Sequence, residues 1–334
     1  MGARRVRLIP GEYLEQHRET VEREIRNHMD LSVYGHPCIA QLQRVTIMPP
    51  SLALIMECGG DITLETLMEQ HGGRLPVHMA RRVFAQVVLT LDFCRRLGKC
   101  NRNVTPACWH VYYENPAPES MEASSSPTEV CVKLSDFCHM KDALADSAPK
   151  TKLGIALYTA PEIVISRPGS SYDGAAADVW SCGVLLAMMV FGAHPFIQPD
   201  EDAEDLAAAA SAAVDTPSGR SAMQLLVKNQ MAQLLGNAIS GQMTLPAGPA
   251  LAHPEVVQLL KSMLQPDPAN RATTTDILAH PWVSGALRPD WVGLNERLVQ
   301  AHSHPSSNNP AREVIQTALR MHRQLQQQRV MQVM

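Results

Sequence analysis

The segment "AAADVWSCGVLLAMMVFG", residues 175–192, constrains this chain more than any other stretch, because it is apolar on almost all of its faces. A helix with that pattern is buried at the centre of a domain. No run of about eighteen consecutive apolar residues occurs anywhere in the chain, so no membrane-spanning helix is predicted. The segment therefore predicts a folded domain that is large enough to enclose a whole helix.

Composition and charge narrow the class of protein further. The chain has 334 residues, of which 45% are hydrophobic, and this fits one large globular domain or two smaller ones. Its formal net charge is -4, so no overall positive field attracts nucleic acid or anionic lipid. The eight cysteines show no C-x-x-C spacing and the histidines no H-E-x-x-H pair, so no metal site is predicted. We expect a soluble protein of the cytoplasm, the nucleus or both, with no nucleic-acid or membrane partner.

Periodic patterns around the apolar segment predict a mixture of helices and strands. Residues 19–29 form a charged helix candidate, and residues 77–98 repeat apolar positions every three or four residues before stopping at Gly98. The apolar run 51–58 and the alternating stretch 130–137 are typical of strands. The predicted fold class is α+β.

Three further stretches lie outside this pattern. Residues 114–129 are rich in Pro, Ser and Glu, and residues 199–222 combine an acidic run with an alanine run, so both are predicted to be insertions. Residues 284–334 are predicted to be a polar linker followed by a helix that docks on its own domain rather than on a partner or a membrane. The apolar stripe of that helix consists of Ile315, Ala318, Leu319 and Leu325.

Several motifs closely resemble the C-lobe of the eukaryotic protein kinase family. They are "APE" at Ala160–Glu162, "DVWSCGV" beginning at Asp178, "HPF" after it, and "LLKSMLQPDPANRATTTDILAHPWV" further on. In this family the glutamate of "APE" pairs with an arginine, and Arg271 stands at that position. The resemblance therefore implies structural roles for Glu162, Asp178 and Arg271.

Upstream motifs extend the resemblance to the N-lobe. "EREIRNHMDLSVYGHPCIAQLQRV" is similar to the family's C-helix, with Glu24 at the ion-pairing position, and the strand "RRVRLI" places Arg7 where the family has its phosphate-pairing lysine. No glycine-rich loop precedes that strand. Together with "IMECGGDI" and "YDGAAADVWSCGV", these motifs are most similar to the plant SNF-related stress kinases of the calcium/calmodulin-kinase-like group.

The resemblance implies a protein-kinase-like bilobal fold. Its parts are a truncated β-rich N-lobe over residues 1–58, a mainly helical C-lobe over residues 59–283 that contains the two insertions, and the tail 284–334. The implied cofactors are ATP and magnesium. The implied nucleotide-binding candidates are Arg7, Glu24, Glu57 and Asp136, and Asp136 is also the candidate metal ligand.

The stretch "NRNVTPACWHV", residues 101–111, aligns with the family's catalytic loop but lacks its reactive groups. Asn103 replaces the aspartate that accepts the substrate's proton, and an amide takes up no proton near neutral pH. Thr105 replaces a phosphate-neutralising lysine. Cys108 replaces the asparagine that binds a second magnesium ion, which prefers oxygen ligands. Arg102 keeps the family's residue.

Two neighbouring motifs also depart from the family. The metal-binding "DFG" appears as Asp136, Phe137 and Cys138, so the carboxylate remains while the glycine is absent. In the activation segment Thr151 keeps a hydroxyl where the subfamily is often phosphorylated, and Arg102 is the residue that would bind such a phosphate. Ile155 replaces the threonine that Ser/Thr kinases hydrogen-bond to the catalytic loop.

Each candidate keeps a simpler alternative. Glu24 is either half of an ion pair or a solvated helix residue, and Asp136 either contacts metal or nucleotide or is held by backbone amides. Asn103 and Arg102 are expected to have structural roles, and Thr151 is either a regulatory site or an ordinary exposed threonine.

The resulting hypothesis is a pseudokinase that binds or regulates protein partners such as an active kinase or its substrates. The runner-up is an active Ser/Thr kinase with atypical catalytic residues. A third reading, an incomplete chain start, would supply the glycine-rich loop but would leave Asn103, Thr105 and Cys108 unchanged.

Overall fold

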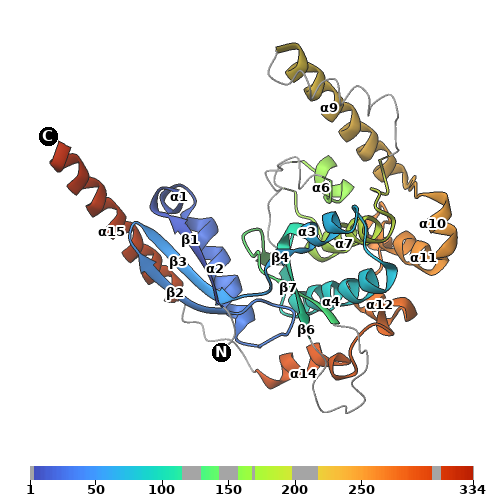
Figure 1. Ribbon diagram of the computed structural model, residues 1–334, viewed down its shortest axis with the longest axis horizontal. Coiled ribbons are helices and arrows are strands. Elements are labelled where there is room, and N and C mark those ends of the chain that lie inside the picture. Colours follow the sequence, from blue (N-terminus) through green and yellow to red (C-terminus); the bar gives the residue numbers. More distant parts are fainter. Residues whose placement is uncertain are drawn as a thin grey trace.

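The computed structural model describes residues 4–114, 129–142, 157–167, 170–197, 217–302 and 310–333. Within them the chain forms two lobes, one built on a small sheet and one mainly helical, and these confirm the expected bilobal α+β fold (Figure 1). Thr151, Ile155, residues 115–128 of the first expected insertion and most of the second lie outside the described residues.

The N-lobe is an antiparallel sheet with two helices against it. Its elements in chain order are β1 (Arg4–Pro10), α1 (Gly11–Gln16), α2 (Arg18–Ser32), β2 (Leu42–Met48) and β3 (Ser51–Glu57). The strand order is β1-β3-β2, and Arg7 on β1 lies opposite Leu54 on β3. The apolar run that predicted a buried strand is therefore the central strand of this sheet.

The last helix of the chain, α15 (Pro310–Val333), completes the N-lobe core (Figure 1). It packs against α1, α2, β2 and β3, as expected for a helix that docks on its own domain. Ile315, Ala318 and Leu319 are buried there in one cluster with residues of the sheet. The ring of His322 on α15 packs directly on Gly11, so a larger residue at position 11 would force that ring to move.

The C-lobe contains the larger core and most of the helices. Its strands are β4 (Ile62–Thr63), β5 (Lys99–Cys100), β6 (Trp109–Glu114), β7 (Glu129–Leu134) and β8 (Lys141–Asp142). Its helices are α3 (Leu64–Gln70), α4 (Val77–Arg96), α6 (Pro161–Ile165), α7 (Gly174–Phe191), α9 (Pro217–Ser240), α10 (Ala247–Ala252), α11 (Pro254–Met263), α12 (Thr274–Ala279), α13 (Pro281–Ser284) and α14 (Leu294–Ala301).

Helix α7 is the predicted central helix. Asp173 caps its first turn by accepting hydrogen bonds from Ala175 N (2.9 Å) and Ala176 N (3.1 Å), and Gly192 ends it in the left-handed region at φ 67°. The helix is long and apolar enough to cross a membrane by composition alone, yet most of it is buried inside the protein. It packs between α4 and α11, so it is the core helix of a globular lobe.

The stretch before α15 differs from the expected polar linker over residues 284–334. Trp291 and Asn295 are buried, and the Asn295 amide donates to Leu89 O (3.0 Å) and to Asp92 Oδ2 (2.9 Å) of α4. The polarity of the sequence did not reveal the burial of Asn295, because its amide group is accommodated by donating hydrogen bonds to a distant helix.

Candidate functional site between the two lobes

The ion pair between Arg7 and Glu24 lies on the N-lobe side of the site. Arg7 on β1 donates to both carboxylate oxygens of Glu24 on α2, the second contact being 3.5 Å long. The Glu24 side chain is 3% exposed and the Arg7 side chain 39%. Burial raises the pKa of Glu24, and the Arg7 charge offsets part of that increase. The structure therefore brings the two residues together, and Glu24 is not a solvated helix residue.

The replaced residues of the catalytic loop contact one another. The Asn103 amide donates to Cys108 Sγ (3.2 Å) and to Asp136 Oδ2 (3.3 Å). Thr105 Oγ1 lies 3.2 Å from Cys108 Sγ. Pro106 begins the short 3-10 turn that carries Cys108 back toward Asp136. The loop is thus closed by hydrogen bonds among the groups that stand at the family's reactive positions.

Asp136 is held by the same cluster. Its Oδ1 accepts a hydrogen bond from Cys138 N (3.0 Å), and its Oδ2 accepts from the Asn103 amide and, at 3.8 Å, from the Cys108 thiol. Burial and the neighbouring Asp136 charge raise the pKa of Cys108 to about 12, so the thiol is neutral near pH 7. A neutral thiol is a poor ligand for magnesium, which prefers oxygen.

Few groups in this part of the chain are placed to bind a metal ion. Among the described residues, no group of three or more His, Cys, Asp or Glu side chains is arranged to hold one. Asp136 alone keeps the residue type that the family uses, and one of its oxygens already accepts a backbone N–H. The residues present therefore do not fit a pair of magnesium ions.

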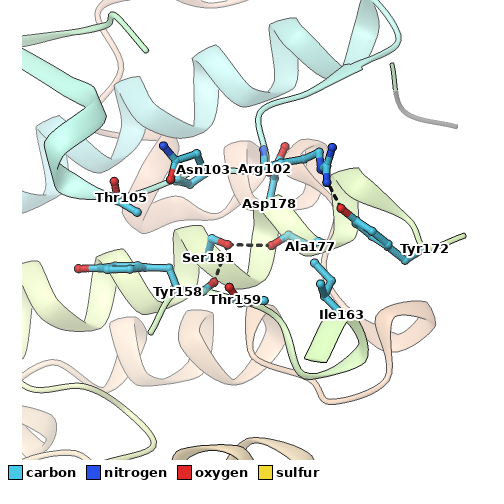
Figure 2. A pocket seen from close by; sticks show the side chains of 11 residues that line it. Arg102, Asn103, Thr105, Tyr158, Thr159, Ile163, Tyr172, Ala177, Asp178 and Ser181 are labelled. Carbon is cyan, nitrogen blue, oxygen red and sulfur yellow. Dashed lines mark hydrogen bonds between the residues drawn. The ribbon is translucent and has the colours of Figure 1, made fainter. Parts of the chain in front are cut away.

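Asp178 holds the backbone at the start of the catalytic loop. This buried carboxylate accepts hydrogen bonds from Asn101 N (2.6 Å) and Arg102 N (2.7 Å). Arg102 has φ 65°, a conformation that is uncommon for a non-glycine residue and that these bonds help to hold. Figure 2 shows Arg102 reaching toward Tyr172, whose hydroxyl accepts from Arg102 Nε at 2.7 Å.

The cavity in Figure 2 is small. It has a volume of about 20 Å³, is lined by residues such as Thr105, Tyr158 and Ser181, and has room for about one water molecule. The Ser181 hydroxyl donates to Tyr158 O at 2.7 Å, which joins α7 to the segment before "APE".

A second ion pair stabilises the far side of the C-lobe. Two guanidinium nitrogens of Arg271 each donate to a carboxylate oxygen of Glu162 at 2.8 Å, and the Arg271 side chain is 0% exposed. Arg271 also donates to Ala176 O (2.9 Å) and lies over the Trp180 ring, 5.1 Å from its centroid. Glu162 and Arg271 are thus paired as the family resemblance implies.

Three cations gather beside the catalytic loop. Burial lowers the pKa of Arg23, and the neighbouring charge of Arg102 lowers it further. Burial also lowers the pKa of Lys141, with added repulsion from Arg102 and Arg23. Since Arg23 Nε has no hydrogen-bond partner within the described residues, an anion would be stabilised at this point.

Contacts across the lobes involve residues that the sequence analysis missed. Arg5 on β1 donates to His110 Nε2 on β6, and Lys133 Nζ on β7 lies 2.6 Å from Glu57 Oε1 at the end of β3. The signal for Arg5 was its position two residues before Arg7, which places both side chains on one face of the strand. His110 carried no local signal. Of the residues in these contacts, only Glu57 was predicted.

The two lobes, the ion pairs and the catalytic-loop position define a protein of the kinase class. A family model described as "Protein kinase domain" matches residues 11–283, so the chain belongs to the protein kinase domain family.

Curated relatives agree with this assignment. The chain is 29% identical over 312 residues to "Serine/threonine-protein kinase SRK2A" of Physcomitrium patens, which covers 92% of this chain and 74% of that protein. It is 31% identical over 266 residues to "Serine/threonine-protein kinase SAPK7" of Oryza sativa subsp. japonica, covering 79% of this chain and 60% of that protein. It is 28% identical over 314 residues to "Serine/threonine-protein kinase SRK2E" of Arabidopsis thaliana, covering 92% and 73%.

Proposed function

We propose that this chain is a pseudokinase, a protein-kinase fold that acts by binding protein partners and transfers no phosphate at an appreciable rate. The observation that carries the proposal is the hydrogen-bonded cluster of Asn103, Cys108 and Asp136. In that cluster the amide occupies the position of the proton acceptor, and it donates to Asp136, the carboxylate retained at the family's metal-binding position. The groups are engaged with each other instead of being presented to a substrate.

The size of the expected loss supports this reading. A missing general base typically slows a reaction by roughly 10²- to 10⁴-fold, which alone would leave a slow enzyme. Here the charge of the family's lysine is also missing at Thr105, and a neutral thiol stands at Cys108. Effects within one catalytic unit do not add. Nevertheless, within the described residues Asp136 is the only carboxylate that hydrogen-bonds to this cluster. No second carboxylate among those residues is therefore in place to act as the base.

The partners that suit the proposal are proteins. The matched relatives are named as Ser/Thr protein kinases, and membership of the protein kinase family favours protein substrates or another kinase as partners. An active kinase of that group or one of its substrates is therefore the proposed partner, in the cytoplasm or the nucleus. The net charge of -4 supports neither a nucleic-acid nor a membrane partner.

The competing function is an active ATP- and magnesium-dependent Ser/Thr kinase with atypical residues. Two observations favour it: Arg7 and Glu24 form the expected ion pair, and Asp136 is retained beside the loop. In that function Arg7 and Glu57 would contact the nucleotide and Asp136 a metal ion.

A phosphotransfer assay separates the two functions. Purified protein is incubated with radiolabelled ATP and magnesium, alone and with a generic protein substrate, beside an Asp136→Asn variant. We expect both proteins to give the same background signal. Robust transfer by the native chain that disappears in the Asp136→Asn variant would show that the chain is an enzyme.

Regulation by partner binding needs its own measurement. The purified chain is titrated into an active recombinant relative, and the activity of that kinase toward a peptide is recorded. We expect a saturable change that the isolated Asp136→Asn variant reproduces, because binding does not need the carboxylate. If the activity of the kinase does not change during the titration and sedimentation detects no complex, the proposed partner class is wrong.

We further propose that Thr151 is a phosphosite whose phosphate would be bound by Arg23, Arg102 and Lys141. Besides burial, the charge of Arg102 lowers the pKa values of both Arg23 and Lys141, so positive charge is concentrated around Arg102. Intact-mass analysis after treatment with an active relative should show one added phosphate that is lost in Thr151→Val. Equal labelling of both proteins would contradict the assignment.

A further inference from the structure

Arg5 makes a contact that joins the two lobes across the cleft. Along β1 the side chains alternate, so Arg5 and Arg7 lie on the same face of the strand. Arg7 turns to Glu24, whereas the Arg5 guanidinium donates to His110 Nε2 on β6 of the C-lobe. These two residues are 105 positions apart in the sequence.

His110 continues this contact into the catalytic loop. Its Nδ1 lies 2.6 Å from Ser135 Oγ, and that hydroxyl donates to Cys108 O at 3.3 Å. Burial and the Arg5 charge lower the pKa of His110 to about 4, so the ring is neutral near pH 7. A neutral ring can accept a hydrogen bond from Arg5 at Nε2 and donate one from Nδ1–H to the Ser135 hydroxyl. Every polar group in this chain of contacts therefore has a suitable partner.

A parallel contact lies next to the first. Lys133 is the strand partner of His110, and its ammonium group contacts Glu57 at 2.6 Å, where β3 leaves the N-lobe. The connection after β3 is packed on the same two residues, because a Cβ at Gly59 would stand 3.0 Å from Lys133 Cβ and 3.2 Å from His110 Cβ. The two lobes are thus joined by two neighbouring contacts, Arg5 with His110 and Lys133 with Glu57.

We infer that Arg5 and His110 occupy the space between the lobes through which a nucleotide would have to pass to lie between Arg7, Glu57 and Asp136, so that this chain excludes adenine nucleotides. A base in that space would displace a charged hydrogen bond and leave the buried His110 ring without its donor. The inference goes beyond the proposed function, because a chain that transfers no phosphate can still bind ATP.

Arg5→Ala is the primary test variant. Arg5 is exposed except for this contact, so its truncation should not unfold the chain. The second variant, Arg5→Ala combined with His110→Leu, removes both partners and keeps an apolar side chain of similar size at the buried position. Arg44→Ala is the matched control, because Arg44 is an exposed arginine on β2, at the other edge of the same sheet.

Binding of ATP and ADP with magnesium, and of adenosine alone, is measured by calorimetry for the four proteins. A hydrogen bond to a charged group is worth about 1.5 to 3 kcal/mol, so its removal should tighten nucleotide binding by roughly 10- to 100-fold. We expect both Arg5 variants to show that gain for all three probes, and Arg44→Ala to behave as the native chain. Hydrogen exchange should also become faster in residues 4–10 and 109–114 of the Arg5 variants.

Two results would overturn the inference. One is binding of ATP by the native chain itself, and the other is a double variant that binds nucleotide no better than the native chain. The phosphotransfer assay is read separately, so the two proposals fail in different ways. ATP binding by the native chain without transfer overturns only the exclusion of nucleotides, whereas transfer by the native chain overturns both.

Discussion

The two lobes place their charged side chains in different environments. In the C-lobe, Arg271 is fully buried and binds both oxygens of Glu162 as well as backbone carbonyls. In the N-lobe, Arg7 pairs with a buried Glu24 but is itself 39% exposed, and Arg5 reaches across to the other lobe. From this difference we expect the C-lobe pair to contribute more to the stability of the fold than the more exposed charges between the lobes.

The apolar cores differ in a related way. The C-lobe core is assembled around α7 mainly from helices and strands of that lobe, and Leu31 near the end of α2 also packs into it. The N-lobe core contains Ile315 and Leu319 of α15, which come from the other end of the chain. Both lobes therefore rely on contacts between distant parts of the chain, and in the N-lobe one of these contacts is made by the last helix.

Replacing Arg271 with methionine should have the largest effect and would test the C-lobe side of this comparison. Breaking a buried pair leaves Glu162 without its partner charge and typically costs about 3 to 5 kcal/mol. Urea unfolding measures the change in the free energy of unfolding. Arg44→Met, on the exposed face of β2, should change it by less than about 0.5 kcal/mol. A loss below about 1 kcal/mol at Arg271 would mean that the pair is not what holds the C-lobe.

Truncating Ile315 to alanine should destabilise the protein by about 2 to 4 kcal/mol, because it removes a buried side chain that joins α15 to the N-lobe sheet. Hydrogen exchange should rise first in α2 and β3 and only later in α7. Gln316→Ala, one exposed position along the helix, is the control. Uniformly faster exchange in both lobes would show that the two cores are not independent.

Acid should remove a further part of the C-lobe stability through Asp92. Burial would raise the pKa of this carboxyl, but hydrogen bonds from Arg96, Asn295, Arg95 and Thr274 outweigh burial and lower the pKa to about 2 from an ordinary value of 3.8. Because the folded-state pKa is the lower one, the stabilisation is complete above about pH 4 and is lost as the pH falls through about 2. The difference corresponds to about 2 kcal/mol.

Unfolding curves of the native chain and of Asp92→Asn, recorded from about pH 6 to about pH 2, test this prediction. The free energy of unfolding of the native chain should exceed that of the variant near pH 6, and this difference should shrink as the pH falls. Parallel pH profiles would contradict it.

Glu24→Gln should have a smaller effect, about 1 kcal/mol or less. The amide still accepts a hydrogen bond from Arg7, and the exposed side of Arg7 is screened by solvent. Urea unfolding beside the Arg271→Met variant gives the ratio of the two effects directly. If Glu24→Gln and Arg271→Met lowered the free energy of unfolding by equal amounts, the two ion pairs would contribute equally, which would contradict the difference between the lobes.

Restoring the family's residues in the catalytic loop should have the smallest effect of all, because we expect it to produce no measurable phosphotransfer. A triple variant with Asn103→Asp, Thr105→Lys and Cys108→Asn regains the family's residue types, yet we expect no phosphotransfer above background while Arg5 and His110 stay in contact. The same radiolabel assay is used, with the triple variant also combined with Arg5→Ala. Transfer by the triple variant alone would show that the loop is the only block.

Local patterns predicted much of the fold. The helix over residues 77–98 is α4, the strand over 51–58 is β3, and the apolar segment is α7, because side-chain periodicity reports which face of an element is buried. The pairing of Glu162 with Arg271 followed from motifs that stand at fixed positions in this family. Patterns of this kind fail where a buried group is polar, as Asn295 is.

The candidate site was predicted only in part. Its catalytic-loop members were found because each replaces a known residue type, and Arg7 and Glu24 because of their motif positions. The cluster of Asn103, Cys108 and Asp136 was not foreseen as a set of mutual hydrogen bonds. Neither were the contacts of Arg5 and Lys133, since each depends on distances between strands of different lobes.

The sequence by itself determined that this chain adopts a two-lobed α+β fold of the kinase class, and that its catalytic loop carries an amide, a hydroxyl and a thiol where the family has reactive groups. Only the tertiary structure decided that these groups bind one another, that α15 completes the N-lobe, and that Arg5 meets His110 across the cleft. The physical reason is the separation along the sequence of the residues that interact. Periodicity and motif spacing act over a few residues, whereas these contacts join side chains that only folding brings together.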